Sequence, residues 1–345
     1  MRILLVDNLM IRRYGRTHLL PGRKLMCGCI RNNWRICEFS DRDVTRYLAP
    51  LGIRTIGAAI ANSKLIKTAL NFQPDIILIG HCDYITNETL YKIRDYLPAV
   101  RIAHFNIDAI WQEWTCKQIE RRKNSCDAIF VTSAGPKLKK WITGKNVVAY
   151  MPNPVDPSIE CADNSLIDSK SLVRDFFFAG TPHPKDPRMM VIQELKNYFA
   201  NSNKQMRCDF FGIDCPVVLG AEYEKVLRTS KMSINLNRHD DWKWYSSDRI
   251  AHLMGSGILT FQSKRGNMQD FFNENECVFY DSTPDLIEKL YWYNIHDDIR
   301  RRIAHAGRVK YHQLFSGARI LKFMVETLLD GAYSERYEWL SEVYR

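Results

Sequence analysis

The feature that most constrains the fold is a regular alternation of short apolar runs with longer amphipathic stretches along most of the 345 residues. The apolar runs have the length of strands, and the stretches between them have the spacing of helices with one buried face. In the first half the expected strands are Arg2–Asp7, Trp34–Phe39, Ile76–Ile79, Arg101–Phe105, Ala128–Val131 and Val147–Tyr150. Strands that alternate with helices predict a parallel sheet covered by helices on both faces.

Helices are expected between these strands, at Gly22–Asn33, Asp41–Leu48, Ser63–Asn71, Asn87–Leu97, Cys116–Lys123 and Pro136–Thr143. Ser40 followed by Asp43 is typical of a capping box in which Asp replaces Glu. Asn62 and Thr86 are predicted as further N-caps, because their side-chain oxygens can accept from the first free amides of a helix.

The segment Met151–Pro157 (MPNPVDP) interrupts this pattern and predicts a stiff linker, because its prolines cannot continue a helix or a central strand. The alternation then starts again and ends in a stretch, Asp297–Tyr344, that is expected to be wholly helical. The second set of expected strands is Asp175–Phe178, Arg207–Phe211, Met232–Leu236, Ile258–Phe261 and Cys277–Tyr280, with helices between them at Pro187–Ala200, Ala221–Arg228, Asp248–Met254, Met268–Phe272 and Pro284–Tyr293.

The fold class is therefore α/β, with two Rossmann-like domains whose parallel sheets face a central cleft and with a helical C-terminal tail. Residues 1–155 are expected to form the first domain and residues 156–317 the second. A helix at about 318–345 is expected to pack back on the first domain.

The charge balance favours anionic partners. Lysine and arginine number 49 against 39 acidic residues, a net charge of +10. The basic residues are dispersed along the chain, whereas nucleic-acid binding would concentrate them in a stripe. The expected partners are therefore phosphorylated small molecules or an anionic membrane surface, and no nucleic acid.

Ten cysteines are scattered without a CxxC pair, which favours reduced thiols. A zinc site at Cys27, Cys29, Cys37 and His18 is the alternative, although structural zinc sites use more regular spacing. The chain starts directly with a strand-like segment, and its apolar runs are much shorter than a membrane span, so the expected location is the cytoplasm or the inner face of the cell membrane.

Polar side chains follow several strands of the first half, where a parallel sheet places its functional groups. Ser40 and Asp43 follow the second strand, His81 and Asp83 follow the third, and Asp108 and Thr132 follow the fourth and fifth. Helix capping is an alternative role for the serine and threonine. No cap requires His81 or Asp108, which makes both of them candidates for function.

In the second half, an apolar strand runs into Gly180-Thr181, and a helix is expected to begin at Pro187. Glycine allows a ligand to approach the backbone, and a helix N-terminus attracts phosphate. Lys185 and Arg188 place positive charge at that same end, against the preference of the helix dipole, which indicates an external anion.

Further on, Arg249 begins another expected helix, which ends in a corner at Ser256-Gly257. Its guanidinium group has the geometry to bind a diphosphate. A salt bridge to Asp248 or to another acidic residue is the alternative.

The block Asp248–Tyr293 resembles the C-terminal half of the CgeB-like glycosyltransferases, a bacterial branch of the two-domain transferases called GT-B. The resemblance rests on Arg249, the Ser256-Gly257 corner, Glu276 before a strand, Asp281, and the helix from Pro284. Residues 303–320 are similar to the helical segment at the C-terminal end of that family's proteins. Residues 31–54 resemble transferases of bacterial surface-polysaccharide clusters, and Met151–Asp156 resembles an interdomain segment of many GT-B enzymes.

The resemblance implies a metal-independent, hexosyltransferase-like enzyme of surface glycan synthesis (lipopolysaccharide or capsule). The donor is a nucleotide diphosphate sugar, bound as a substrate by the second domain with no separate cofactor, and the acceptor is a saccharide or a lipid-linked glycan bound by the first domain. Donor binding is assigned to Gly180, Thr181, Lys185, Arg188, Arg249, His252, Ser256, Gly257 and Glu276. If the reaction inverts configuration, Asp108, Asp43, His81 and Asp83 are the candidates for the general base, the first two being preferred.

The chain departs from the family at one point: many retaining relatives carry two glutamates where this sequence has Trp244 and His252. This leaves the stereochemistry open. It also leaves open two rival functions, a nucleotide-sugar epimerase or hydrolase on the same fold and a non-catalytic glycan-binding subunit. The aromatic tail Gly331–Arg345 is expected to pack on the first domain, and docking at an anionic membrane is its alternative role.

Overall fold

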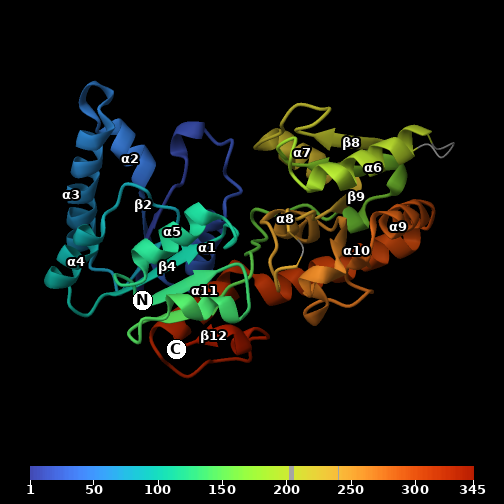
Figure 1. Cartoon of the computed structure of the whole chain (residues 1–345). Coiled ribbons are helices and arrows are strands. Elements are labelled where there is room, and N and C mark those ends of the chain that lie inside the picture. The colour runs from blue at the N-terminus through green and yellow to red at the C-terminus, as the bar shows by residue number, and fades with distance from the viewer. Residues whose placement is uncertain (202–205, 240) are drawn as a thin grey trace. The chain divides into compact units, whose positions relative to one another are not determined.

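The structure, a computed structural model, describes residues 1–201, 206–239 and 241–345, which divide into two compact units (Figure 1). Unit 1 comprises Met1–Pro154 and Gly317–Arg345, and unit 2 comprises Val155–Ser316. The chain first passes from unit 1 to unit 2 inside the proline-containing segment Met151–Pro157. It returns to unit 1 between two consecutive helices.

Unit 1 contains a seven-stranded sheet in the order β12-β6-β5-β4-β3-β1-β2. All neighbouring strands are parallel except β12, which runs antiparallel to β6. The strands are β1 Arg2–Asp7, β2 Arg35–Ser40, β3 Ile76–Ile79, β4 Arg101–Asn106, β5 Ala128–Val131, β6 Val147–Tyr150 and β12 Val343–Tyr344. Every residue of β3 and β5 is buried. Helices cover both faces of such a sheet, which explains why its inner strands are continuously apolar.

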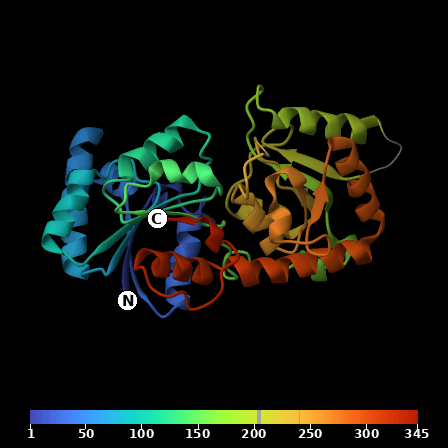
Figure 2. The same ribbon diagram turned by 60° about the horizontal axis from the view of Figure 1, so that its bottom comes forward.

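The helices of unit 1 are α1 Pro21–Arg31, α2 Asp41–Tyr47, α3 Arg54–Phe72, α4 Asn87–Tyr96, α5 Glu113–Arg122 and α11 Gly317–Leu328. Right-handed crossovers place α3, α4 and α5 on one face of the sheet and α1 on the other. There α11 packs against α1 (Figure 2). Two glycines permit this close packing, because a Cβ on Gly28 would lie 2.4 Å from the backbone of Gly317.

The end of the chain differs from the predicted continuous helix. The tail is helical through Leu328, and the helical prediction for the residues beyond it is wrong. Asp330 adopts a positive φ of 54° and Gly331 follows, which ends the helix. The chain then returns to the sheet as β12. Trp339 and Tyr337 are buried against Phe323, at ring distances of 5.4 and 5.1 Å, so these two aromatic side chains serve packing.

Unit 2 contains a five-stranded, fully parallel sheet in the order β11-β10-β9-β7-β8. Its strands are β7 Arg174–Ala179, β8 Cys208–Phe211, β9 Ser230–Ile234, β10 Leu259–Ser263 and β11 Val278–Tyr280. Its helices are α6 Arg188–Asn201, α7 Ala221–Arg228, α8 Arg249–Gly255, α9 Thr283–Ile295 and α10 Asp297–Phe315. The prediction of two α/β units with parallel sheets is confirmed.

Three local predictions have different outcomes. Thr86 is the N-cap of α4 and accepts from the amide of Thr89. Asn62 lies inside α3, so its predicted capping role is wrong; the helix starts earlier because small and apolar residues precede it. The segment predicted as a helix from Pro136 is a short 3-10 helix that ends at Trp141.

None of the helices in the described ranges combines the length and apolar character needed to cross a lipid bilayer.

Candidate active site

A small hollow of about 70 Å³ lies at the carboxyl edge of the sheet in unit 1. Parallel α/β sheets bind their ligands at this edge. The hollow lies where β1, β3 and β4 end and where the loop before α1 returns to the sheet. It is lined by Asp7, Asn8, Met10, Leu20, Pro21, Gly22, His81, Phe105, Asn106, Ile107 and Asp108.

Asp7, the last residue of β1, is a buried carboxylate that lines this hollow. Its Oδ1 accepts hydrogen bonds from the backbone amides of His81 and Asn8, both at 2.8 Å. A Cβ on Gly22 would lie 2.2 Å from Asp7 Oδ2, so only glycine leaves room for this carboxylate at the start of α1. Burial raises the pKa of Asp7, and the hydrogen bonds from His81 and Asn8 oppose that shift.

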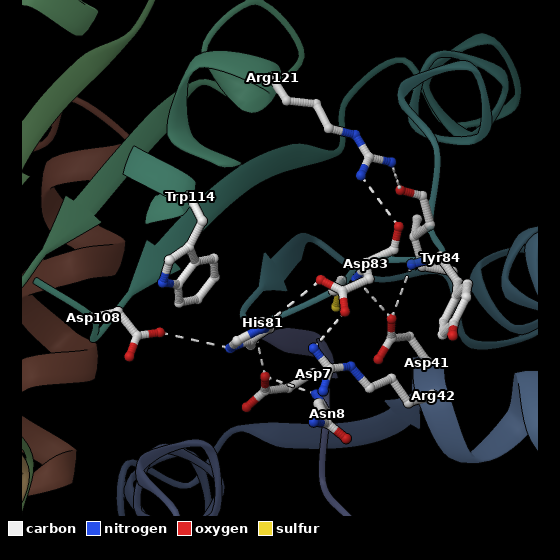
Figure 3. Close-up of polar contacts among 12 residues, drawn as sticks. Asp7, Asn8, Asp41, Arg42, His81, Asp83, Tyr84, Asp108, Trp114 and Arg121 are labelled. Atoms are coloured by element: carbon white, nitrogen blue, oxygen red, sulfur yellow. Dashed lines mark hydrogen bonds and ion pairs between the residues drawn. The ribbon is translucent and has the colours of Figure 1, made fainter. Parts of the chain in front are cut away.

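His81 and Asp108 stand together in this hollow (Figure 3). The Nδ1 atom of His81 lies 3.7 Å from Oδ2 of Asp108, and its Nε2 lies 3.8 Å from Oδ1 of Asp83. The ring of Trp114 lies beside the imidazole, with a centroid distance of 5.1 Å. Burial raises the pKa of Asp108, and His81 opposes the shift. A carboxylate with a raised pKa beside an imidazole can accept a proton from a bound hydroxyl.

The other two predicted base candidates do not line this hollow, although Asp83 contacts His81, which does. Asp43 accepts from the backbone amides of Ile11 (2.8 Å) and Arg12 (3.3 Å) and from the hydroxyl of Ser40. It therefore fastens the loop after β1 to α2, and the predicted capping box does not form. Asp83 pairs with Arg42 at the rim (Figure 3). Neither carboxylate lines the hollow, so Asp108 and His81 are the two predicted residues that do.

Asp41 holds the loop that carries His81. Its Oδ2 accepts from the amides of Asp83 (2.9 Å) and Tyr84 (3.2 Å), and the side chain is fully buried. Burial raises the pKa of Asp41 to about 6, against the opposing effect of the amides of Tyr84 and Arg42 and of the Arg42 charge.

This raised pKa predicts a loss of stability as the pH rises. An unfolded aspartate titrates near pH 4, so between about pH 4 and 6 the folded state holds the proton that the unfolded state has released. We expect the free energy of unfolding to fall by up to about 3 kcal/mol over this window because of Asp41. Relative to the wild type, Asp41→Asn should therefore gain stability between pH 4 and 7, as measured by urea unfolding. Asp95 is exposed, and Asp95→Asn is the control: its free energy of unfolding should differ from that of the wild type by the same amount at every pH. The same pH dependence of this difference in both variants would contradict the role of Asp41.

A second hollow, of about 230 Å³, lies at the carboxyl edge of the sheet in unit 2. It lies beyond the ends of β7 and β8 and is closed by the segment before α7. Its lining is mostly apolar, and Thr181 and Tyr223 are its two residues with a side-chain hydroxyl group. The lining residues are Ala179, Gly180, Thr181, Phe211, Val217, Val218, Leu219 and Tyr223.

Arg249 lies next to this hollow. Its Nε donates to the carbonyl of Ala179 (3.0 Å), and one terminal nitrogen donates to Leu236 (3.3 Å). Its guanidinium carbon lies 5.0 Å from the ring centre of Phe178. A Cβ on Gly180 would approach the other terminal nitrogen to 3.2 Å, so the glycine leaves space at the guanidinium.

Within the described ranges Arg249 has no ion pair with a carboxylate. Asp248, the predicted alternative partner, instead lies 3.1 Å from Nε2 of His252. Burial lowers the pKa of Arg249, and the nearby charge of Arg188 lowers it further. A partly buried cation without a counter-ion favours an anionic ligand.

The N-terminus of α6 already has an internal anion. Asp186 accepts from the backbone amide of Arg188 (3.0 Å) and forms two side-chain hydrogen bonds with the same arginine. Arg238 also pairs with Asp186, at 3.0 Å. Burial would raise the pKa of Asp186, but the hydrogen bonds from Arg188 lower it to about 2. Arg188 therefore already has a partner within the chain, but two arginines on one carboxylate leave the cluster positive, so the binding of an external anion here stays a prediction.

Two further donor predictions change with the structure. The Gly180 amide donates to the carbonyl of Phe211 (3.1 Å), which removes it from the predicted diphosphate donors. Lys185 follows β7 at the carboxyl edge but is exposed, and no contact places it beside Arg249.

The remaining predicted donor residues lie away from the hollow. Ser256 and Gly257 precede β10, and Glu276 precedes β11, which places all three at the amino edge of the sheet. Gly257 turns the chain at a φ of 66°, and Glu276 orders its own loop by accepting from Asn273. His252 has Glu160 at 2.8 Å from Nδ1 and Asp248 beside Nε2, so both ring nitrogens already face carboxylates.

Asp7, Asn8 and Tyr223 line the two hollows but were not among the predicted site residues. The signal for Asp7 and Asn8 was present, because they follow the first strand as His81 follows the third. No such signal exists for Tyr223, which reaches its hollow from inside α7. In the described part of the chain, no three His, Cys, Asp or Glu side chains are placed to hold a metal ion together.

Comparisons with known proteins agree with this architecture. Residues 199–326 match a protein-family model described as "Glycosyl transferase-like". A search of the curated proteins finds no match.

Solved structures match nearly the whole chain. HepE of Anabaena in complex with UDP has a TM-score of 0.56 and 12% identity, with 96% of this chain and 100% of that chain covered. Sucrose-phosphate synthase of Thermosynechococcus elongatus has a TM-score of 0.57 and 12% identity, with 96% and 98% covered. A structure of trehalose-6-phosphate synthase has a TM-score of 0.55 and 10% identity, with 96% and 100% covered. The chain therefore has the GT-B fold, and more than a third of its sequence is similar to a glycosyl transferase-like family.

Proposed function

We propose that this protein transfers a sugar from a nucleoside diphosphate sugar to a hydroxyl group of a saccharide or lipid-linked acceptor. The observation that carries the proposal is Arg249, a cation without a carboxylate partner in the described ranges, beside a hollow at the carboxyl edge of unit 2. The similar structures support it, because HepE was solved with UDP, with UDP and glucose, and with UDP-glucose.

In this proposal unit 2 binds the donor. The apolar hollow accepts the nucleoside, and Arg249 pairs with the diphosphate, assisted by the positive cluster of Arg188 and Arg238 around Asp186. When the bond between the sugar and the diphosphate breaks, its electron pair stays on the leaving diphosphate. A guanidinium group held in place before the reaction stabilises that charge without reorganisation.

Unit 1 binds the acceptor in the hollow that contains His81 and Asp108. If the reaction inverts configuration, Asp108 accepts the proton of the acceptor hydroxyl while the hydroxyl oxygen bonds to the anomeric carbon. If it retains configuration, the same two residues position the acceptor. We further propose a hexose as the transferred group, transfer without a metal, and a role in surface glycan synthesis, the last from the resemblance of residues 31–54.

Product analysis tests this function. The protein is incubated with a panel of nucleoside diphosphate sugars and saccharide acceptors, and products are identified by mass spectrometry. The proposal expects a glycosylated acceptor and one nucleoside diphosphate per transfer. Release of free sugar without an acceptor would indicate a hydrolase. An isomerised donor would indicate an epimerase, and binding of the acceptor without any product would indicate a glycan-binding subunit.

A further inference from the structure

Two loops of unit 1 expose large apolar side chains to solvent. The first loop follows β1 and carries Ile11 (48% exposed) and Tyr14 (90%). The second joins α2 to α3 and carries Leu51 (98%) and Ile53 (44%). Isolated apolar residues are common on protein surfaces, but two loop tips with such residues indicate a partner.

The two loops lie at the same end of unit 1 (Figure 1). The first leaves the carboxyl end of β1. The second precedes α3, which returns the chain to the opposite edge of the sheet, where β3 begins. Asp43 of α2 accepts from the amides of Ile11 and Arg12, so the first loop is attached to the helix that leads into the second loop.

Local structure does not explain these side chains. Leu51 has a φ of 52° and Tyr14 a φ of 49°, in the left-handed region that favours glycine and asparagine. A leucine that is 98% exposed and holds an unfavourable backbone conformation contributes neither to the core nor to the turn. Contact with another apolar phase would stabilise it.

The exposed charged side chains of these two loops are positive, and Asp43, which contacts the first loop, is buried. Arg13 and Arg16 are exposed on the first loop, and Arg46 and Arg54 on either side of the second. The segments 8–37 and 44–74 contain no aspartate or glutamate. Arginines that surround protruding aliphatic side chains complement a bilayer with anionic headgroups, into which the apolar tips insert.

We propose that Ile11, Tyr14, Leu51 and Ile53, with the four arginines Arg13, Arg16, Arg46 and Arg54, form a docking surface for anionic membranes. A nucleic acid would use the arginines but not the exposed leucine and isoleucines. A second copy of this chain would bring the same positive charge against itself. Both are therefore less well matched than a lipid surface.

The docking surface is continuous with the hollow of unit 1. Met10 and Leu20, at the two ends of the first loop, both line that hollow. Docking would therefore place the hollow at the membrane surface, where a lipid-linked acceptor is available. This consequence rests on the proposed function, whereas membrane docking itself does not.

Sedimentation with vesicles tests the docking surface independently of activity. We expect the wild-type protein to bind phosphatidylcholine vesicles that contain phosphatidylglycerol, to bind pure phosphatidylcholine weakly, and to dissociate at high salt. Leu51→Ser combined with Ile53→Ser should weaken binding about tenfold or more. Arg13→Glu combined with Arg16→Glu should do the same, because each charge near the surface contributes about fivefold.

Matched controls make the same kinds of substitution at exposed positions outside the docking surface. Leu166→Ser with Met190→Ser removes two exposed apolar side chains from unit 2, and Lys145→Glu with Lys225→Glu makes the same change in net charge. Both pairs should retain wild-type binding. Equal losses in control and test pairs, or no binding of anionic vesicles by the wild type, would overturn the proposal. So would binding of an oligonucleotide or self-association that depends on Leu51 while vesicles stay unbound.

Discussion

Arg249→Met is expected to reduce the affinity for a nucleoside diphosphate by about a hundredfold or more. Loss of a preorganised charged donor in a water-poor site has effects of this size. Methionine retains much of the apolar stem, and within the described ranges no carboxylate loses a partner. We therefore expect the free energy of unfolding to stay within about 2 kcal/mol of the wild type. Calorimetric titration and urea unfolding measure the two quantities.

Two further variants make this prediction specific. Arg249→Lys keeps the charge but loses the planar fork and should recover only part of the affinity. Arg174→Met is the matched control, because Arg174 also lies over an aromatic ring of unit 2, at 5.4 Å from Phe211, but pairs with Asp209. It should bind nucleotide normally. A large loss of stability in Arg249→Met with unchanged affinity would show that this arginine has only a structural role.

Asp108→Asn is expected to lower the rate of transfer by about a hundred- to ten-thousandfold while nucleotide affinity is unchanged. The amide keeps the size of the side chain but cannot accept the acceptor proton. His81→Asn should also lower the rate, and the double variant should be little worse than Asp108→Asn, since groups that act as one unit are not additive. Rates with saturating donor and acceptor give the comparison.

The pH profile provides a second readout for Asp108. Burial raises the pKa of this carboxyl group, and only its ionised form can accept a proton. The wild-type rate should therefore fall as the pH drops through a value above the ordinary 3.8 of aspartate. Asp83→Asn, in the rim carboxylate that pairs with Arg42, should change the rate less than tenfold. A loss in Asp108→Asn no larger than in Asp83→Asn would refute the assignment of Asp108 as the base.

Much of the fold follows from local sequence. The strands Arg2–Asp7, Ile76–Ile79, Ala128–Val131 and Val147–Tyr150 form as predicted, because strands covered on both faces are continuously apolar and are bounded by polar residues. The strand at Val343–Tyr344 could not be predicted in this way. It exists because the chain end pairs with β6, which is distant in sequence.

The sites were less predictable, for two physical reasons. Asp43 follows a parallel strand just as Asp108 does. However, the backbone amides of the loop after β1 donate to both of its carboxylate oxygens, and sequence spacing does not predict this contact. The sequence alone was enough to exclude three residues from the donor site, namely Ser256, Gly257 and Glu276. Each precedes a parallel strand, and residues before such strands lie at the edge opposite the ligand.

Binding of a nucleoside diphosphate in unit 2 is the step on which every later step of transfer depends. Calorimetric titration of the full chain with uridine, guanosine, adenosine and cytidine diphosphates tests it directly. We predict saturable binding of at least one of them, with one site per chain, that is lost in Arg249→Met and kept in Arg174→Met. Absence of binding for all four, or binding that survives Arg249→Met unchanged, would contradict the account.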